Sequence, residues 1–197
     1  MRTTTDPAVA ARAVDDGDLA VYPTETVYGL GADALAAAAV ERVFEAKRRD
    51  RDDPVSMAVP SVEAALEYTH PTAPERAFMH EFLPGPVTVV LERAPAVPAV
   101  LTAGRDRVGV RVPDCEPALA LLAETGPLTA TSANVSGRES ARRVADLDPE
   151  VRAAVAVALD AGETPGGTPS TVVDVTAGRV HRRGAAAADV EDWLDAH

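Results

Sequence analysis

The stretch YPTETVYGLGADA, residues 22–34, carries more polar groups than a chain turn needs. A turn between a strand and a helix uses about one glycine for a positive φ. Here Thr24, Glu25 and Thr26 precede two glycines, Gly29 and Gly31. These surplus hydroxyl and carboxylate groups indicate a loop that holds a small polar ligand.

Lys47 is the only lysine in the chain, although Lys and Arg together number 19. At about 100° per helical residue, it falls on the face that also holds Val40, Val43 and Phe44. A cation in a last helical turn stabilises the helix dipole by about 0.3–1 kcal/mol, but an arginine would do this equally well. A compact ammonium group at one chosen site also suits a phosphate. The residues alone leave both interpretations open.

The run KRRDRDDP, residues 47–54, places three arginines among three aspartates. Such alternating charge is typical of a solvated loop. The alternative is that some of these arginines, Arg48, Arg49 and Arg51, turn inward, where guanidinium groups bind phosphate oxygens in a bidentate manner.

Two later loops are rich in hydroxyl groups and glycine: TATSANVSGRES and GETPGGTPSTVVD. Ordinary Asx and Ser/Thr turns use the same residues. Strands that deliver many donors to one sheet edge also suit a nucleotide. Neither loop is a Walker A motif, a dinucleotide-binding glycine turn or a hydrolase elbow. Any phosphate site here is therefore of a different kind.

Arg111 lies within VGVRVPD, a predicted strand in which it faces away from Val110 and Val112. It is either on a wet face or a receptor for a carboxylate, which pairs well with guanidinium. Cys115 has no cysteine partner, and we expect it to be a packing residue. The four histidines have no informative spacing.

Apolar periodicity predicts alternating strands and helices. We expect an α/β (α+β) fold, in which a twisted mixed sheet carries helices packed around it and a concave ligand groove. Strands are expected at 19–22, 55–59, 87–92, 107–113 and 179–182. One more is expected at the start of the stretch 127–137, and another at the end of the stretch 166–175. Helices are expected at 6–14, 35–47, 62–68, 74–82, 117–124 and from 189.

Length and composition predict one domain over residues 1–197. The sequence has no signal-peptide pattern and no apolar run that spans a bilayer, so we expect a soluble cytoplasmic protein. It has no Cys/His spacing of the metal-binding type.

The chain is strongly acidic: 31 acidic residues leave a net charge of -12. Such a surface suits a very salty cytoplasm, where self-repulsion is screened, so we expect a halophilic source. It should also repel nucleic acid overall, so contact with tRNA is expected to be weak and local.

Six stretches, in their order along the chain, resemble the YrdC family of threonylcarbamoyl-AMP synthases. They are YPTETVYGLGADA, FEAKRRDRDDP, FLPGPVTVVL, VGVRVPD, TSANVSGRES and GGTPSTVVDV, and the resemblance extends over residues 16–184. The resemblance implies a nucleotidyltransferase that makes threonylcarbamoyl-AMP and pyrophosphate from L-threonine, bicarbonate and ATP with Mg²⁺. The product would pass to a transferase complex that modifies adenosine 37 of tRNA.

The resemblance also implies residue roles. Lys47 and Arg49 would be catalytic at the ATP phosphates. The threonine site would comprise Thr24, Ser56, Arg111 and Ser170. The ATP site would add Arg51, Ser132, Asn134, Ser140 and Arg182, with Arg183 a rival for the last position.

The sequence departs from the family pattern at Asp50, where a proline is usual. Two alternative functions remain: a carbamoyl-transfer relative of the domain in hydrogenase-maturation proteins, and an RNA-binding or ribosome-associated module without synthase activity. The missing segments of the larger proteins argue against the first, and the negative charge argues against the second.

The acidic surface generates a prediction about salt. Raising NaCl or KCl from 0.1 M to several molar should increase the free energy of unfolding, because screening weakens repulsion among exposed carboxylates. Thermal unfolding followed by circular dichroism measures this. Stability that does not change with salt would contradict the halophilic assignment.

Overall fold

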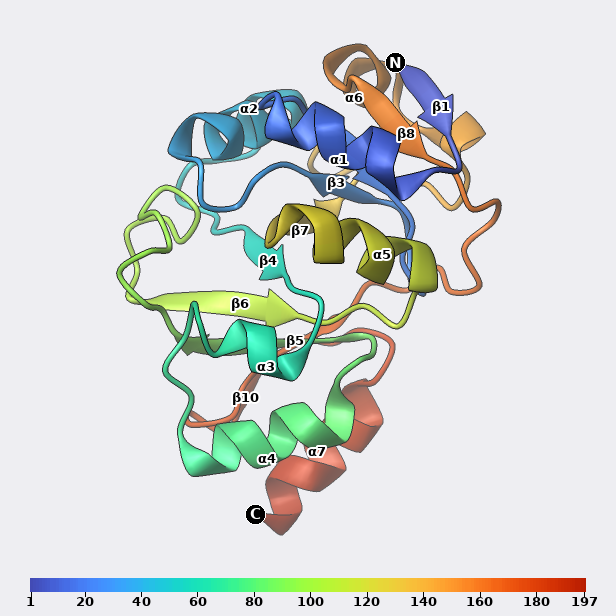
Figure 1. The fold of residues 1–197 in the computed structure, drawn as a ribbon. Coiled ribbons are helices and arrows are strands. Elements are labelled where there is room, and N and C mark those ends of the chain that lie inside the picture. Colours follow the sequence, from blue (N-terminus) through green and yellow to red (C-terminus); the bar gives the residue numbers. More distant parts are fainter.

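The computed structural model describes residues 1–197 and has ten strands in one sheet (Figure 1). The strands are β1 Arg2–Thr4, β2 Ala20–Tyr22, β3 Gly29–Gly31, β4 Ser56–Ala58, β5 Val87–Glu92, β6 Arg107–Arg111, β7 Leu128–Ser132, β8 Val157–Leu159, β9 Thr171–Asp174 and β10 Arg179–Arg182. Their order across the sheet is β1-β8-β2-β3-β7-β4-β6-β5-β9-β10. The sheet contains parallel pairs, such as β4 with β6, and antiparallel pairs, such as β5 with β6, which confirms the predicted mixed sheet.

Seven α-helices and one short 3₁₀ helix accompany the sheet. They are α1 Pro7–Asp15, α2 Ala37–Lys47, α3 Val62–Ala65, α4 Ala73–Phe82, α5 Glu116–Thr125, α6 Pro149–Ala154, α7 Ala187–Ala196 and η1 Val144–Asp146. None of the helices is long and apolar enough to span a membrane.

Local chemistry explains where the helices begin. The side chain of Asp6 accepts a hydrogen bond from the backbone of Ala8, and Pro7 occupies the first turn of α1. At α4, Thr72 and Glu75 form a reciprocal capping box. Both starts agree with the predicted helices to within a residue.

Helices cover both faces of one half of the sheet. On β1, β8, β2, β3 and β7, the helices α1 and α5 pack against one face, while α2 and α6 pack against the other. Alternation along β2 explains this, because Val21 enters one apolar cluster and its neighbours Ala20 and Tyr22 enter the opposite one.

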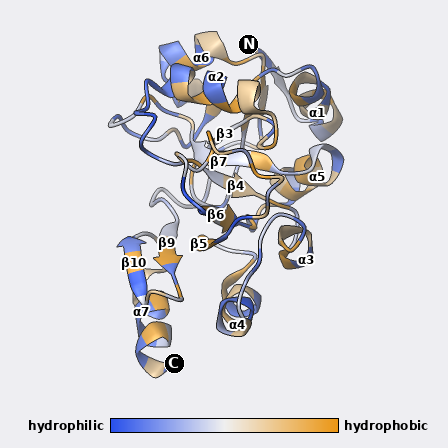
Figure 2. Ribbon diagram, turned by 90° about the vertical axis from the view of Figure 1, so that its left-hand side faces the viewer, coloured by the Kyte–Doolittle hydropathy of each residue, from blue (hydrophilic) through white to orange (hydrophobic).

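The other half of the sheet is covered on one face only. Val108 and Val110 of β6 pack into the apolar cluster beneath α3, α4 and α7. The residues between and beside them, Arg107, Gly109 and Arg111, face the opposite way, into a cavity. Figure 2 shows α4 and α7 with both hydrophobic and hydrophilic segments, as expected for helices with one buried face. The uncovered face of this half forms the concave groove.

The structure differs from the sequence prediction at one end of the sheet. The predicted loop 22–34 contains strand β3, which pairs with β2 and β7. Strand β8, preceded by α6, was not predicted, yet it lies between β1 and β2. A three-residue strand such as Val157–Leu159 is too short to show a period, and long-range pairing alone defines it.

Candidate functional site

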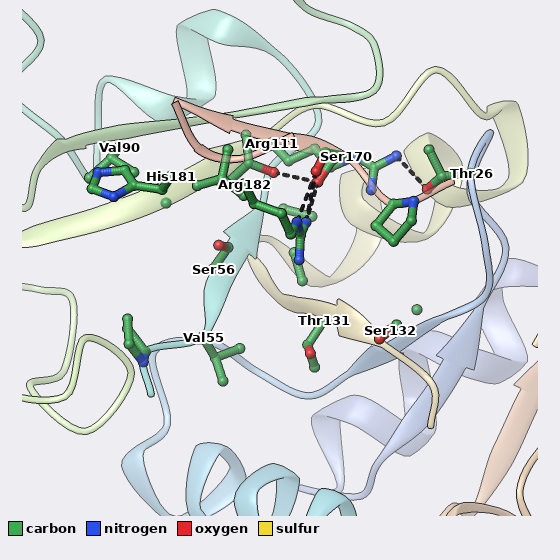
Figure 3. Close-up of a pocket in the computed structure, with 18 of the residues that line it drawn as sticks. Thr26, Val55, Ser56, Val90, Arg111, Thr131, Ser132, Ser170, His181 and Arg182 are labelled. Carbon is green, nitrogen blue, oxygen red and sulfur yellow. Dashed lines mark hydrogen bonds between the residues drawn. The ribbon is translucent and has the colours of Figure 1, made fainter. Parts of the chain in front are cut away.

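A cavity of about 740 Å³ occupies the uncovered face of the sheet (Figure 3). Its wall comes from the loop after β2 and from β4, β5, β6, β7, β9 and β10. The predicted site residues in this wall are Thr24, Arg49, Ser56, Arg111, Ser132, Ser170 and Arg182. The fold therefore brings together residues that lie up to 158 positions apart in the sequence (24 to 182).

Arg111 is the most enclosed cation of the cavity wall. Its side chain is 10% exposed, and its Nη2 atom lies 2.8 Å from Glu25 Oε1 in an ion pair. The same nitrogen donates a hydrogen bond to Thr26 Oγ1 at 3.0 Å. Arg111 follows the strand alternation expected from the sequence, since Val110 and Val112 are buried in the apolar core. It is placed to bind an anionic group within the cavity.

The hydroxyl of Thr24 is used within its own loop. Thr24 Oγ1 donates to the carbonyl of Val27 at 2.7 Å and lies 2.8 Å from Thr26 Oγ1. The backbone N–H groups of Thr26 and Val27 donate to the same oxygen. Thr24 therefore shapes the loop as well as lining the cavity.

Ser170 joins three strands at the edge of the cavity. Its hydroxyl lies 2.9 Å from Thr88 Oγ1, and Arg182 Nη2 donates to it at 3.0 Å. Arg182 also donates through Nε and Nη2 to the Ser170 carbonyl. The structure thus places Arg182 in the cavity, whereas its rival Arg183 forms a surface ion pair with Glu191.

Lys47 is buried behind the cavity and is not part of its wall. Its ammonium group donates to the backbone carbonyl of Ser132 and to that of Asn134, the latter at 2.7 Å. Burial, aided by the charge of Arg49, lowers the pKa of Lys47 to about 7. The apolar face predicted for this helix is confirmed, and the lysine at its end anchors the loop that follows β7.

Arg49 reaches the cavity because helix α2 ends sharply. Arg48 at the helix end adopts a left-handed conformation with φ 49°, and its N–H bonds to Glu45. The chain then turns, and Arg49 donates to the carbonyls of Asp53 and Pro54 at 3.1 and 3.0 Å. Of the three arginines in this charged run, only Arg49 lines the cavity.

The cavity wall contains five arginines and three aspartates: Arg49, Arg105, Arg107, Arg111, Arg182, Asp53, Asp106 and Asp174. Three of these guanidinium groups, those of Arg49, Arg111 and Arg182, lie near one another. Burial, together with the nearby charges of Arg111 and Arg49, lowers the pKa of Arg182. This mutual repulsion arises inside a protein whose net charge is -12. A concentrated positive charge of this kind, in a site lined by hydroxyl groups, favours a ligand with several negative charges.

Besides Lys47, three predicted ATP ligands lie outside the cavity wall: Arg51, Asn134 and Ser140. Arg51 forms ion pairs with Glu41 and Glu45 on the surface of α2, where it also covers the ring of Phe44. The predicted role of Arg51 in ATP binding therefore gains no support from its position, because Arg51 is paired with Glu41 and Glu45, which lie one helical turn apart.

The amide of Asn134 donates to the carbonyls of Val135 and Arg138 at 2.8 and 2.9 Å. Ser140 donates to Asn134 Oδ1 at 3.5 Å. These side chains close the loop after β7 upon itself, and Lys47 holds the same loop from below. Asn134 and Ser140 thus shape the loop that presents Ser132 to the cavity.

The residues of the site that sequence reasoning missed include Glu25, the charge partner of Arg111, and His181, Arg105 and Arg107 in the cavity wall. In a regular strand, the neighbours His181 and Arg182 would point to opposite faces of the sheet. A bulge between Val180 and Arg182 breaks that alternation, so both line the cavity. No sequence signal marks this bulge.

Cys115 is half-buried, and burial raises the pKa of its thiol, in agreement with a packing role.

The lowered pKa of Lys47 generates a prediction about stability and pH. An unfolded lysine titrates near 10.5, so between pH 7 and pH 10 the unfolded chain binds up to one more proton than the folded chain. The free energy of unfolding of the wild type should therefore rise with pH relative to Lys47→Met, by at most about 1.4 kcal/mol per pH unit. Urea denaturation at pH 6–9.5 measures the difference. The two curves should run parallel below pH 6, and parallel curves over the whole range would contradict the prediction.

Comparison with known proteins agrees with this geometry. A family model described as Sua5_yciO_yrdC, telomere recombination, matches residues 12–184. The threonylcarbamoyl-AMP synthase of Pyrococcus abyssi is 43% identical over 171 residues, which cover 85% of this chain and 50% of that protein. That of Bacillus subtilis is 38% identical over 177 residues, with coverage of 87% and 51%.

Among solved structures, P. abyssi Sua5 complexed with L-threonine superimposes with a TM-score of 0.82 at 38% identity, covering 93% of this chain and 57% of that one. The chain spans about half the length of the curated relatives it matches in P. abyssi and B. subtilis. The matched region includes every strand from β2 to β10 and the whole cavity wall. The chain therefore belongs to the Sua5/YciO/YrdC family.

Proposed function

We propose that this protein is an L-threonylcarbamoyladenylate synthase, a nucleotidyltransferase that makes threonylcarbamoyl-AMP and pyrophosphate from L-threonine, bicarbonate and ATP. One observation carries the proposal: a single cavity holds an enclosed arginine, Arg111, suited to a carboxylate, beside further arginines, of which Arg49 and Arg182 are suited to phosphates. The relatives named threonylcarbamoyl-AMP synthase support this product, and the threonine complex of P. abyssi Sua5 supports L-threonine as a substrate.

In the proposed reaction, the deprotonated amine of threonine attacks the carbon of CO₂ derived from bicarbonate, with loss of water. This forms the N–C bond of a carbamate. A carbamate oxygen then attacks the α-phosphorus of ATP in line, and the bond to the β-phosphate breaks to release pyrophosphate. The site contributes position and charge, and it needs no nucleophilic side chain of its own.

The cavity residues would divide this work. Arg111 would bind the threonine carboxylate, with the hydroxyls of Ser56 and Ser170 nearby in the same wall. Arg49 and Arg182 would neutralise phosphate oxygens, and Ser132 would meet them from the end of β7. Lys47 would act mainly through the loop carbonyls it holds.

Mg²⁺ belongs to this proposal as a partner of ATP. No group of three or more His, Cys, Asp or Glu side chains is arranged to hold a metal ion. Phosphate oxygens and water suit Mg²⁺, which usually keeps several waters and few protein ligands. The ion would therefore enter as part of the nucleotide substrate.

The product, a reactive acyl-adenylate, would pass to a tRNA threonylcarbamoyl transferase complex that modifies adenosine 37, and we place this step in the cytoplasm. The alternative is an RNA-binding or ribosome-associated module of the same fold. The net charge of -12 disfavours it, because RNA affinity depends on neutralising phosphates.

Pyrophosphate release tests the proposal. With MgATP in high salt, release should require both L-threonine and bicarbonate, since neither alone forms the carbamate. The assay couples pyrophosphate to a colorimetric readout, and mass spectrometry identifies the adenylate. Release that continues when threonine and bicarbonate are omitted in turn would overturn the proposed function.

Lys47→Ala should lower the rate of adenylate formation by about 100-fold, the usual effect of a displacement of about 1 Å in a group that positions the substrate. The variant loses both the ammonium charge and the two carbonyl anchors of the loop after β7. Steady-state pyrophosphate release gives the rate. Arg76→Ala, which removes an exposed cation on α4, is the matched control and should keep the normal rate. Near-normal turnover by Lys47→Ala would refute the role of this lysine.

A further inference from the structure

One nitrogen of the Arg111 guanidinium is committed to the loop after β2. Nη2 contacts both Thr26 Oγ1 and Glu25 Oε1. Nε is buried and has no hydrogen-bond partner, and Nη1 makes no hydrogen bond to the protein. The loop thus holds the guanidinium by one corner, and Nη1 is the accessible nitrogen that is left for a ligand.

Glu25 depends on Arg111 in turn. Both oxygens of its carboxylate are buried, and neither accepts a hydrogen bond. The ion pair with Arg111 is its only one, and its side chain is 14% exposed. Glu25 is absent from the cavity wall, so it lies behind the guanidinium rather than beside a ligand. A buried carboxylate without a partner destabilises the fold, so Glu25 needs Arg111 as much as Arg111 needs Glu25.

The loop around Glu25 is fixed by hydrogen bonds of defined direction. Thr24 gives its only hydroxyl hydrogen to Val27, so Thr26 must donate to Thr24. The Thr26 oxygen is then free to accept from Arg111. On the other side, Gly166 N–H donates to the Glu25 carbonyl at 3.1 Å, and a Cβ at Gly166 would approach that oxygen to 2.6 Å. The backbone of Glu25 is therefore clamped from both sides.

We infer that Glu25 is a positioning residue for the substrate carboxylate: it fixes the Arg111 guanidinium so that Nη1 faces the cavity. The inference rests on the proposed function, because it names L-threonine as the ligand. It assigns to the polar loop a task other than direct contact with the amino acid. The loop orients Arg111, and Arg111 makes the contact with the amino acid.

A competing physical effect has the opposite sign. The negative charge of Glu25 also opposes the arriving carboxylate, so its removal would tighten threonine binding if repulsion dominated. A guanidinium free to rotate among rotamers would bind more weakly, because the fork geometry has to be assembled during binding. The direction of the change in affinity therefore decides between the two effects.

The test measures L-threonine binding by calorimetry without ATP. Glu25→Ala should weaken binding at least about tenfold, and Glu25→Gln should also weaken it, because the neutral amide lacks the charge that pairs with Nη2. KM for ATP and the thermal midpoint report on folding, and KM for ATP should stay within about twofold of the wild type. Asp18→Ala, which breaks a surface ion pair with Arg42, is the matched control and should bind threonine normally.

A second pair of variants keeps the test decisive if Glu25→Ala folds poorly. Because Glu25 acts through Arg111, adding Glu25→Ala to Arg111→Ala should cause no further loss of threonine affinity. The amino alcohol in which the threonine carboxyl is reduced should bind wild type and Glu25→Ala equally. Threonine binding that is unchanged or tighter in Glu25→Ala overturns the inference. A wild type that does not bind threonine overturns the proposed function instead.

Discussion

The mutual repulsion of Arg49, Arg111, Arg182 and Lys47 is the constraint on which the site depends. The four cations are held in two ways, by a carboxylate or by backbone carbonyls. Arg111 has the buried carboxylate of Glu25, and Lys47 has two loop carbonyls. Arg49 and Arg182 donate to backbone oxygens of neighbouring segments. Carbonyl dipoles hold a guanidinium without cancelling its charge, so the positive field in the cavity survives the packing that positions it.

The sheet supplies the geometry that this arrangement requires. Helices bury both faces of the half around β2 and β8, which makes it a rigid base. The half around β6 is packed on one face only, so strand alternation sends Val108 and Val110 to the core and Arg111 to the cavity. The same residues that build the apolar cluster therefore aim the cations. A shift of one residue in the register of β6 would bury Arg111 and expose its apolar neighbours.

Much of this arrangement can be predicted from the sequence, but the shortest strands and some contacts of the site cannot. Periodicity over α2, α4 and β5 predicts those elements closely, because each carries its own apolar pattern. Strands β3 and β8 are three residues long, and only their partners define them. In the site, alternation predicts the face of Arg111, but the His181 bulge and the Glu25 ion pair are tertiary events. The prediction fails where the structure depends on contacts between distant segments.

The two kinds of charge in this protein respond differently to salt. In about 1 M salt, the Debye length falls to about 3 Å, so exposed carboxylates hardly interact with each other. Glu25 and Arg111 are largely closed to solvent ions, and screening acts on them far less. High salt that screens the acidic surface therefore leaves the ion pair between Glu25 and Arg111 largely unscreened. An acidic exterior and a cationic site can coexist because burial, not distance alone, separates their electrostatics.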